Sequence, residues 1–128
     1  MAIKQNAVIV IPTYNEIESI KKLLRLLLDK TFSKISSYQM KILIVDAKSP
    51  DNTADAVRNL MKSYKNLFLL VEDKKEGLGA AYIKGFKYAI EKLKADVLIE
   101  FDGDLQHPPA IIKDLLDAID EGYDYIIG

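Results

Sequence analysis

Short apolar runs alternate with longer segments of helical periodicity along this chain, and this alternation constrains its fold more than any other feature. The runs are rich in Ile, Val, Leu and Phe and are nearly continuous, as in strands that are covered on both faces. They occupy residues 7–11, 42–45, 67–71, 97–101 and 125–128. Between them, apolar residues recur at three- and four-residue steps, as with Tyr82, Phe86 and Ile90. The alternation predicts an α/β fold with a doubly wound, mostly parallel sheet and helices on both of its faces.

The length and the end of the chain bear on its domain organisation. A chain of 128 residues matches one domain of ordinary size, and its sequence contains no internal repeat or interdomain linker. The sequence stops at Gly128 directly after an apolar run, where a free-standing domain would more usually add a helix to cover that strand. We therefore expect residues 1–128 to form the N-terminal part of a larger domain that continues beyond Gly128.

Composition and charge exclude several classes of function. The net charge of −1 provides no excess of positive charge for binding nucleic acid. Cysteine is absent, which excludes disulfides, thiolate metal sites and cysteine nucleophiles. The leucine-rich segment from Ile17 to Leu28 is interrupted by Lys21, Lys22 and Arg25, so it is too short and too charged to span a bilayer and predicts a buried helix.

The loops after four of the predicted strands are the expected place for chemistry, because ligands of open α/β sheets bind at the carboxyl ends of the strands. These loops comprise residues 12–16, 46–53, 72–81 and 102–109. Three of the four begin with an acidic residue at the strand exit. Carboxylates around one crevice suit a divalent cation, or the donor hydroxyl and amide groups of a nucleotide or a sugar.

The sharpest of these motifs is Asp102-Gly103-Asp104. Residues i and i+2 at a strand end project to the same side, and the glycine between them leaves room for a close ligand. Two such carboxylates suit Mg²⁺ or Mn²⁺ bridging to phosphates, since Mg²⁺ usually takes one or two carboxylates and keeps its other positions for water or phosphate. Gln106 follows two residues later and is expected to face the same crevice. The alternative is an acidic turn in which Asp104 only accepts hydrogen bonds from backbone N–H groups.

The loops after the first two strands carry weaker signals. Tyr14 could stack on a base and Glu16 could accept hydrogen bonds from a sugar or a base, although an ordinary turn before an acidic first helical turn would look the same. Asp46 leaves a strand beside the first one, which favours a role at the crevice. Asn52 or Thr53 is expected to cap the helix that follows.

Three glycines, Gly77, Gly79 and Gly85, stand around the start of the third helical segment. Their spacing is not the dinucleotide-binding fingerprint, which should also follow the first strand rather than the third. Tight packing of the helix on the sheet explains them at least as well as phosphate binding.

Taken together, the segments "VIVIPTYNE", "ILIVDAKSPDNTADAV", "GLGAAYIKGFKYAI" and "VLIEFDGDLQHPPAII" resemble, in this order, the family 2 glycosyltransferases of the GT-A fold, a Rossmann-like architecture for nucleotide-diphospho-sugar transferases. Within that family they are most similar to the dolichol-phosphate (polyprenyl-phosphate) mannose synthases. The resemblance extends from about Ala7 to Gly128. "PTYNE" and Asp-x-Asp alone indicate only a broad group, whereas "DGDLQHPP" and the "GLG-AYI-GF" pattern are more particular to the polyprenyl-phosphate sugar transferases.

The resemblance implies a metal-dependent, inverting transfer of mannose from GDP-mannose to dolichyl or polyprenyl phosphate. The residues that it implies on the guanosine side of the donor are Pro12, Tyr14, Glu16, Val45, Asp46 and Ala47. It implies further that Asp102 and Asp104 form the catalytic pair and hold Mg²⁺ or Mn²⁺ on the diphosphate. Gly103 and Gln106 would line the same pocket.

The implied chemistry is physically reasonable. A cation on the diphosphate stabilises the charge that develops on the leaving GDP. The acceptor phosphate is already anionic near neutral pH, so a strong general base is hardly needed. Because a polyprenyl acceptor lies in a bilayer, we expect a cytoplasmic protein, or one at the cytoplasmic face of a membrane, with any anchoring segment or partner beyond Gly128.

Two departures from the family pattern bear on this assignment. The family usually has a second acid after the strand-ending aspartate, in a "DDGS" pattern, and that acid is expected to contact the base. Here Ala47 and Lys48 follow Asp46, so the identity of the nucleotide is left open. The family also supplies a phosphate-binding arginine and the acceptor-facing segments after the position of Gly128.

Other readings compete with the mannosyltransferase. The donor sugar could be glucose or another sugar, and Ala47 also fits a nucleotide-sugar-binding module without catalysis. A signalling receiver domain has similar βα alternation, but it would need paired acids after the first strand, where this chain has "PTYNE".

Overall fold

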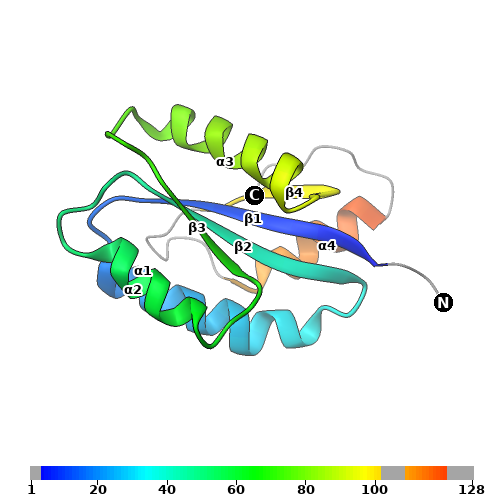
Figure 1. Ribbon diagram of the computed structural model, residues 1–128. Helices are drawn as coiled ribbons and strands as arrows, with labels where there is room; N and C mark the ends of the chain where they lie inside the picture. Colours follow the sequence, from blue (N-terminus) through cyan, green and yellow to red (C-terminus); the bar gives the residue numbers. More distant parts are fainter. Residues whose placement is uncertain (1–3, 102–108, 121–128) are drawn as a thin grey trace.

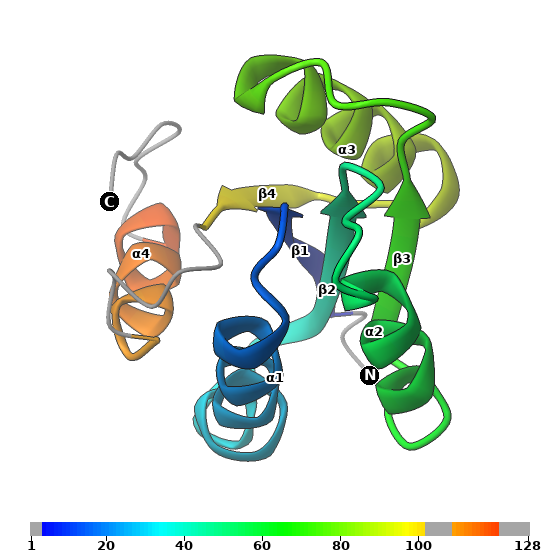
Figure 2. The ribbon, with the colours of Figure 1, turned by 90° about the vertical axis from the view of Figure 1, so that its left-hand side faces the viewer.

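The computed structural model describes residues 4–101 and 109–120, and these form a sheet covered by helices on both faces (Figure 1). In chain order, the elements are β1 (Gln5–Thr13), α1 (Ile17–Arg25), a π-helical segment η1 (Leu26–Thr31), a 3-10 turn η2 (Phe32–Lys34), β2 (Tyr38–Asp46), α2 (Thr53–Met61), β3 (Leu67–Val71), α3 (Leu78–Lys92), β4 (Val97–Glu100) and α4 (Ile111–Asp120). In Figure 2, α3 lies on one face of the sheet, and α1 and α2 lie on the other.

The four strands are parallel and stand in the order β3-β2-β1-β4. The chain adds strands in one direction from β1 to β3 and then crosses back, over α3, to place β4 on the other side of β1. Strand order therefore reverses at β1, which is the switch point at which doubly wound sheets bind ligands. The predicted α/β fold with a parallel sheet is confirmed, whereas the fifth predicted strand, residues 125–128, lies outside the described residues.

Residue alternation along the strands divides the core between the two faces. Ile9 and Ile44 belong to the cluster shared with α1, α2 and α4, whereas Val10 and Val45 belong to the cluster under α3. All four side chains are completely buried. Both faces of a strand are thus apolar, which is why the strands read as continuous hydrophobic runs in the sequence.

The leucine-rich segment forms the predicted helix, but only one of its faces is buried, and Lys22, Arg25 and Leu26 are exposed. Ile20, Leu23, Leu24 and Leu27 are fully buried and recur at helical spacing across α1 and the start of η1. On the same face, α4 is held at its end by Tyr38, whose hydroxyl donates a 2.6 Å hydrogen bond to Asp120 Oδ1.

Gly85 sets the distance between α3 and the sheet. A Cβ atom at this position would lie 2.5 Å from Val10 Cγ1 and 2.9 Å from Val45 Cγ2. Both valines are fully buried, and branching at Cβ leaves their side chains little freedom to move. Gly85 therefore allows α3 to pack closely on the sheet. Tight packing was one of the two explanations that the sequence offered for this glycine, the other being phosphate binding.

We expect Gly85→Ala to lower the free energy of unfolding by about 1–3 kcal/mol, since overpacking outweighs the better helix propensity of alanine. Gly79→Ala in the same helix is the matched control, because a Cβ there meets nothing within 4 Å. That control should be neutral or stabilising by up to about 1 kcal/mol. Urea unfolding measures both variants, and equal stabilities would contradict the packing role.

Candidate nucleotide-binding edge of the sheet

Two loops meet at the carboxyl ends of β1 and β2. The Ala47 N–H donates to the Thr13 carbonyl at 3.0 Å, so the pairing of the two strands extends one residue into the second loop. Further out, the Asn15 N–H donates to Ser49 Oγ at 3.0 Å. The "PTYNE" loop and the loop after β2 are thereby joined into one surface at the switch point.

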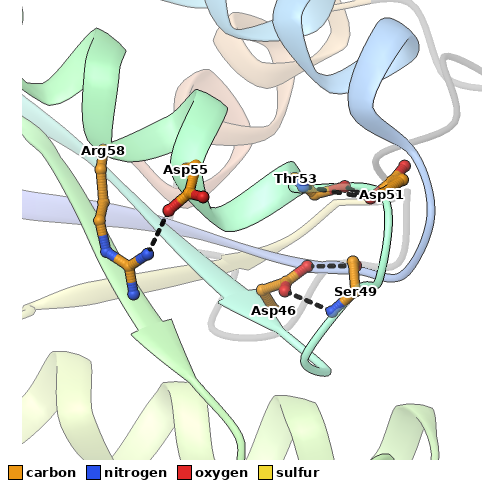
Figure 3. A network of polar contacts seen from close by, with 6 residues as sticks. All are labelled: Asp46, Ser49, Asp51, Thr53, Asp55 and Arg58. Carbon is orange, nitrogen blue, oxygen red and sulfur yellow. Dashed lines mark hydrogen bonds and ion pairs between the residues drawn. The ribbon is translucent and has the colours of Figure 1, made fainter.

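Asp46 organises this junction from inside the protein. Its side chain is completely buried, and Oδ1 accepts hydrogen bonds from Thr13 Oγ1 at 2.7 Å and Ser49 Oγ at 2.6 Å. Oδ2 accepts the Ser49 N–H at 2.8 Å (Figure 3). Strand alternation explains this orientation, because Val45 faces α3 and the next residue must turn to the opposite face.

Asp51 connects the same loop to two helices. Its Oδ2 accepts the Ile17 N–H at 3.3 Å at the start of α1, and its Oδ1 accepts the Thr53 N–H at 3.1 Å at the start of α2. The Thr53 hydroxyl also donates to Oδ1 (Figure 3). Asn52 precedes α2 in the left-handed region (φ 67°) and makes no side-chain cap. Asn52 is thus the N-cap residue by position, as one of the two candidates predicted, but Asp51 provides the side-chain acceptor at this end of α2.

The same hydrogen bonds make stability depend on pH. Burial raises the pKa of Asp51, but the hydrogen bonds from Thr53 and Ile17 favour the carboxylate more strongly, and the pKa is lowered below its ordinary value of 3.8. A carboxyl group whose pKa is lower in the folded state stabilises the fold at pH values above its pKa in the unfolded state. This stabilisation is lost as the pH falls through the pKa of the folded state. We expect the stability difference between the parent and Asp51→Asn to shrink as the pH falls from 6 towards about 2. Urea unfolding across this range measures it, and a difference independent of pH would contradict the assignment.

Three residues of the two loops, Asn15, Lys48 and Asn52, adopt left-handed backbone conformations with φ between 53° and 67°. Asparagine tolerates this region, whereas a lysine there costs about 1 kcal/mol or more. Lys48 stands where the family pattern "DDGS" has glycine, which adopts this conformation freely. Lys48 therefore holds a conformation that glycine would adopt without this cost.

An aromatic ring and a cation from a third loop lie beside this junction. Lys75, between β3 and α3, places Nζ 4.0 Å from the centroid of the Tyr14 ring. Tyr14 is half-buried and Lys75 is exposed. The ring is therefore held at the edge of the sheet, with a cation over its face.

Several predicted donor-binding residues share this edge. Pro12 and Val45 are buried at the ends of their strands, so side-chain contact with a ligand is restricted there. Tyr14, Glu16 and Ala47 are half-buried in the two joined loops. The binding roles of all these residues, and that of the buried Asp46, stay predictions.

The predicted metal ligands follow β4 in the sequence. β4 pairs with β1, and the Phe101 N–H continues this pairing by donating to the Val10 carbonyl at 3.2 Å. The remaining predicted site residues, Asp102, Gly103, Asp104 and Gln106, lie outside the described residues. Within residues 4–101 and 109–120, no group of three or more acidic or histidine side chains could hold a metal ion.

Sequence reasoning did not single out Ser49, Asp51 or Lys75. Ser49 and Asp51 stand in a polar turn before a helix, a context in which hydrogen bonding to nearby backbone is common, so a signal was present. For Lys75 no signal was present, because its position over Tyr14 depends on the packing of a distant loop.

None of the helices in the described part of the chain is both long enough and apolar enough to cross a membrane.

Comparison with known proteins identifies the family. The model of "Glycosyl transferase family 2" matches residues 8–128. A dolichol-phosphate mannosyltransferase of Pyrococcus furiosus is 36% identical over 120 residues, which are 94% of this chain and 32% of that protein. An undecaprenyl-phosphate mannosyltransferase of Micrococcus luteus is 38% identical over 119 residues, which are 93% of this chain and 46% of that protein. The chain thus spans about a third to a half of the length of these relatives.

Solved structures agree on the fold. A mannosyltransferase from Pyrobaculum calidifontis, in complex with GDP-Man and Mn²⁺, superposes with a TM-score of 0.71 at 21% identity, over 99% of this chain and 35% of that one. TarS from S. aureus, in complex with UDP, superposes with a TM-score of 0.70 at 22% identity, over 91% of this chain and 32% of that one. The sheet and its helices therefore have a GT-A-like fold, and the chain belongs to glycosyl transferase family 2.

Proposed function

We propose that residues 1–128 are the donor-binding part of a metal-dependent, inverting transferase that moves mannose from GDP-mannose to a dolichyl or polyprenyl phosphate. The relatives at 36–38% identity, which are named as mannosyltransferases of dolichol phosphate and undecaprenyl phosphate, support this choice within the family. The structural neighbour that carries GDP-Man and Mn²⁺ supports the donor and the metal.

One observation carries the proposal. The carboxyl ends of β2, β1 and β4 stand side by side at the switch point, and the loops after β1 and β2 are joined by hydrogen bonds. The Asp-x-Asp segment follows β4 in the sequence, directly after Phe101. Tyr14, a possible stacking partner for a base, follows β1, and the carboxylate pair that we propose for a metal–diphosphate follows β4, the strand paired with β1, in the sequence.

Each residue has a physical role in this proposal. Tyr14 offers a ring face for stacking on the base, and Glu16 accepts hydrogen bonds from the donor. The buried Asp46 keeps the second loop in place through Thr13 and Ser49 and so acts as a positioning residue.

Asp102 and Asp104 would hold Mg²⁺ or Mn²⁺, and their hard oxygen donors fit either cation. When bound, the cation stabilises the charge on the departing diphosphate. The acceptor phosphate carries its own negative charge, so the chain needs no base at the reacting oxygen.

Calorimetric titration with GDP and UDP, each with and without Mn²⁺, tests the donor half of the proposal. We expect GDP to bind in the presence of Mn²⁺ and to lose most of its affinity without it. Mannose transfer to a polyprenyl phosphate is then assayed with the complete protein. A failure of both nucleotides to bind in the presence of Mn²⁺ would contradict the proposal.

A different sugar is the second candidate. An undecaprenyl-phosphate 4-deoxy-4-formamido-L-arabinose transferase of Pseudomonas fluorescens is 35% identical over 119 residues, 92% of this chain and 33% of that protein. Ala47, in place of an acid, also leaves the choice of base open. Preference for UDP over GDP in the titration would contradict GDP-mannose as the donor and favour a donor with a different sugar.

A further inference from the structure

Glu72 directly follows β3 and continues its pairing with β2. Its N–H donates to the Asp46 carbonyl at 2.8 Å, just as the Ala47 N–H donates to the Thr13 carbonyl. Glu72 therefore lies at the same carboxyl edge as Tyr14 and Ala47, on the strand beyond them. The acid was visible at the strand exit in the sequence, but its surroundings depend on the packing of α3.

The side chain of Glu72 is almost completely buried, with 1% of its surface exposed. Its Oε2 lies 3.1 Å from Lys84 Nζ of α3, which lies equally close to Glu76 Oε2. Its Oε1 is also buried and has no hydrogen-bond partner among residues 4–101 and 109–120. A buried carboxylate oxygen that accepts no hydrogen bond is destabilising. A ligand with a hydrogen-bond donor could supply the missing partner of Oε1.

The free oxygen belongs to the α3 face of the sheet, because Glu72 contacts Lys84 of that helix. Lys75, which lies over the Tyr14 ring, comes from the same short loop as Glu72. The segment between β3 and α3 therefore contributes two groups at this end of the sheet. They are the buried acceptor Glu72 and the cation of Lys75 over the Tyr14 ring.

We propose that Glu72 Oε1 accepts the ring N–H of the donor's nucleobase and selects bases that have one. This inference rests on the proposed function, because it names a specificity residue for that donor. Guanine carries N1–H and uracil carries N3–H, whereas adenine and cytosine present a lone pair at the corresponding ring nitrogen. An ionised carboxylate only accepts hydrogen bonds, so it attracts the first two bases and repels the other two.

Admission of the base requires Lys75 to leave the Tyr14 ring. Exposed cation–π contacts are weak, and stacking of a base on the same ring replaces the lost interaction. The loop 73–77 is exposed throughout, so its displacement breaks little packing, although it also separates Glu76 from Lys84. The ion pair between Lys84 and Glu72 can persist, since it uses the other oxygen.

Titrations of the parent with GDP, ADP and N1-methyl-GDP, all with Mn²⁺, provide the test. We expect the parent to bind GDP about tenfold or more tightly than either of the others, because each lacks the N1–H. In Glu72→Gln, whose amide can donate as well as accept, the preference for GDP over ADP should fall to about threefold or less. The methylated nucleotide tests the parent directly, so the proposal stays falsifiable if the variant does not fold.

Glu76→Gln is the matched control, because it removes the other acidic partner of Lys84 while its own side chain is 39% exposed. This variant should keep the parent's preference for GDP. An unchanged preference in Glu72→Gln, an equal loss in both variants, or equal binding of N1-methyl-GDP and GDP by the parent would overturn the role of Glu72 and leave the proposed function intact. Failure of the parent to bind any of the nucleotides would overturn both.

Discussion

Asp102→Ala and Asp104→Ala are each expected to reduce Mn²⁺-dependent binding of GDP by about 100-fold, and to abolish measurable sugar transfer by the complete protein. With one of its two carboxylate ligands removed, the cation is held less firmly against the diphosphate of GDP. Interactions with the charge that develops on the departing diphosphate are worth several kcal/mol each. The loss should be confined to the metal-dependent part of binding. Residual affinity without Mn²⁺ should match that of the parent, because the base and its contacts are unchanged.

Calorimetry with a series of Mn²⁺ concentrations separates these contributions. Asp114→Ala is the control. Asp114 is an exposed acid on α4, and its substitution removes the same charge from the chain. It should bind GDP and Mn²⁺ as the parent does. If either motif variant retains the parent's response to Mn²⁺, the assignment of the metal to Asp102 and Asp104 is wrong.

Asp46→Ala is expected to lower the free energy of unfolding by about 3 kcal/mol, because it removes an acceptor of three hydrogen bonds and leaves Thr13 and Ser49 unsatisfied in a buried site. It should also weaken nucleotide binding, since Ser49 anchors the "PTYNE" loop through Asn15. Asp46→Asn keeps the shape and can satisfy the hydroxyl groups, so it should cost roughly half as much.

Urea unfolding gives the stabilities, and GDP titration gives the binding of the variants that stay folded. A loss below about 1 kcal/mol in Asp46→Ala would show that the buried network is not needed to hold the edge of the sheet. A stable variant with unchanged GDP affinity would remove Asp46 from the positioning role.

The strands were predictable because their residues are apolar on both faces, a pattern that only a doubly covered sheet produces. Their ends were not. β2 begins at Tyr38, before the polar Gln39 and Lys41, because its pairing with β1 extends from Gln5↔Tyr38. Such pairing is a property of two strands together, so a hydrophobic run in one of them underestimates its length.

The acids at the strand exits show what sequence can and cannot give. Asp46 and Glu72 were visible as carboxylates at the expected edge, yet both are turned into the protein. Strand alternation decides the face, and the partners Ser49 and Lys84 decide whether the charge is satisfied. The side-chain acceptor at the start of α2 is Asp51, because Asn52 turns the chain in a left-handed conformation. Residue preferences for helix ends do not predict this backbone conformation.

The carboxylate of Asp51 closes the first turn of two helices at once, through Ile17 and Thr53. Opening of this loop would therefore fray α1 and α2 together, so the two helices and the ligand edge would behave as one cooperative unit. A ligand that orders the loop would then tighten the whole helical layer on that side of the sheet, far from any atom that it touches.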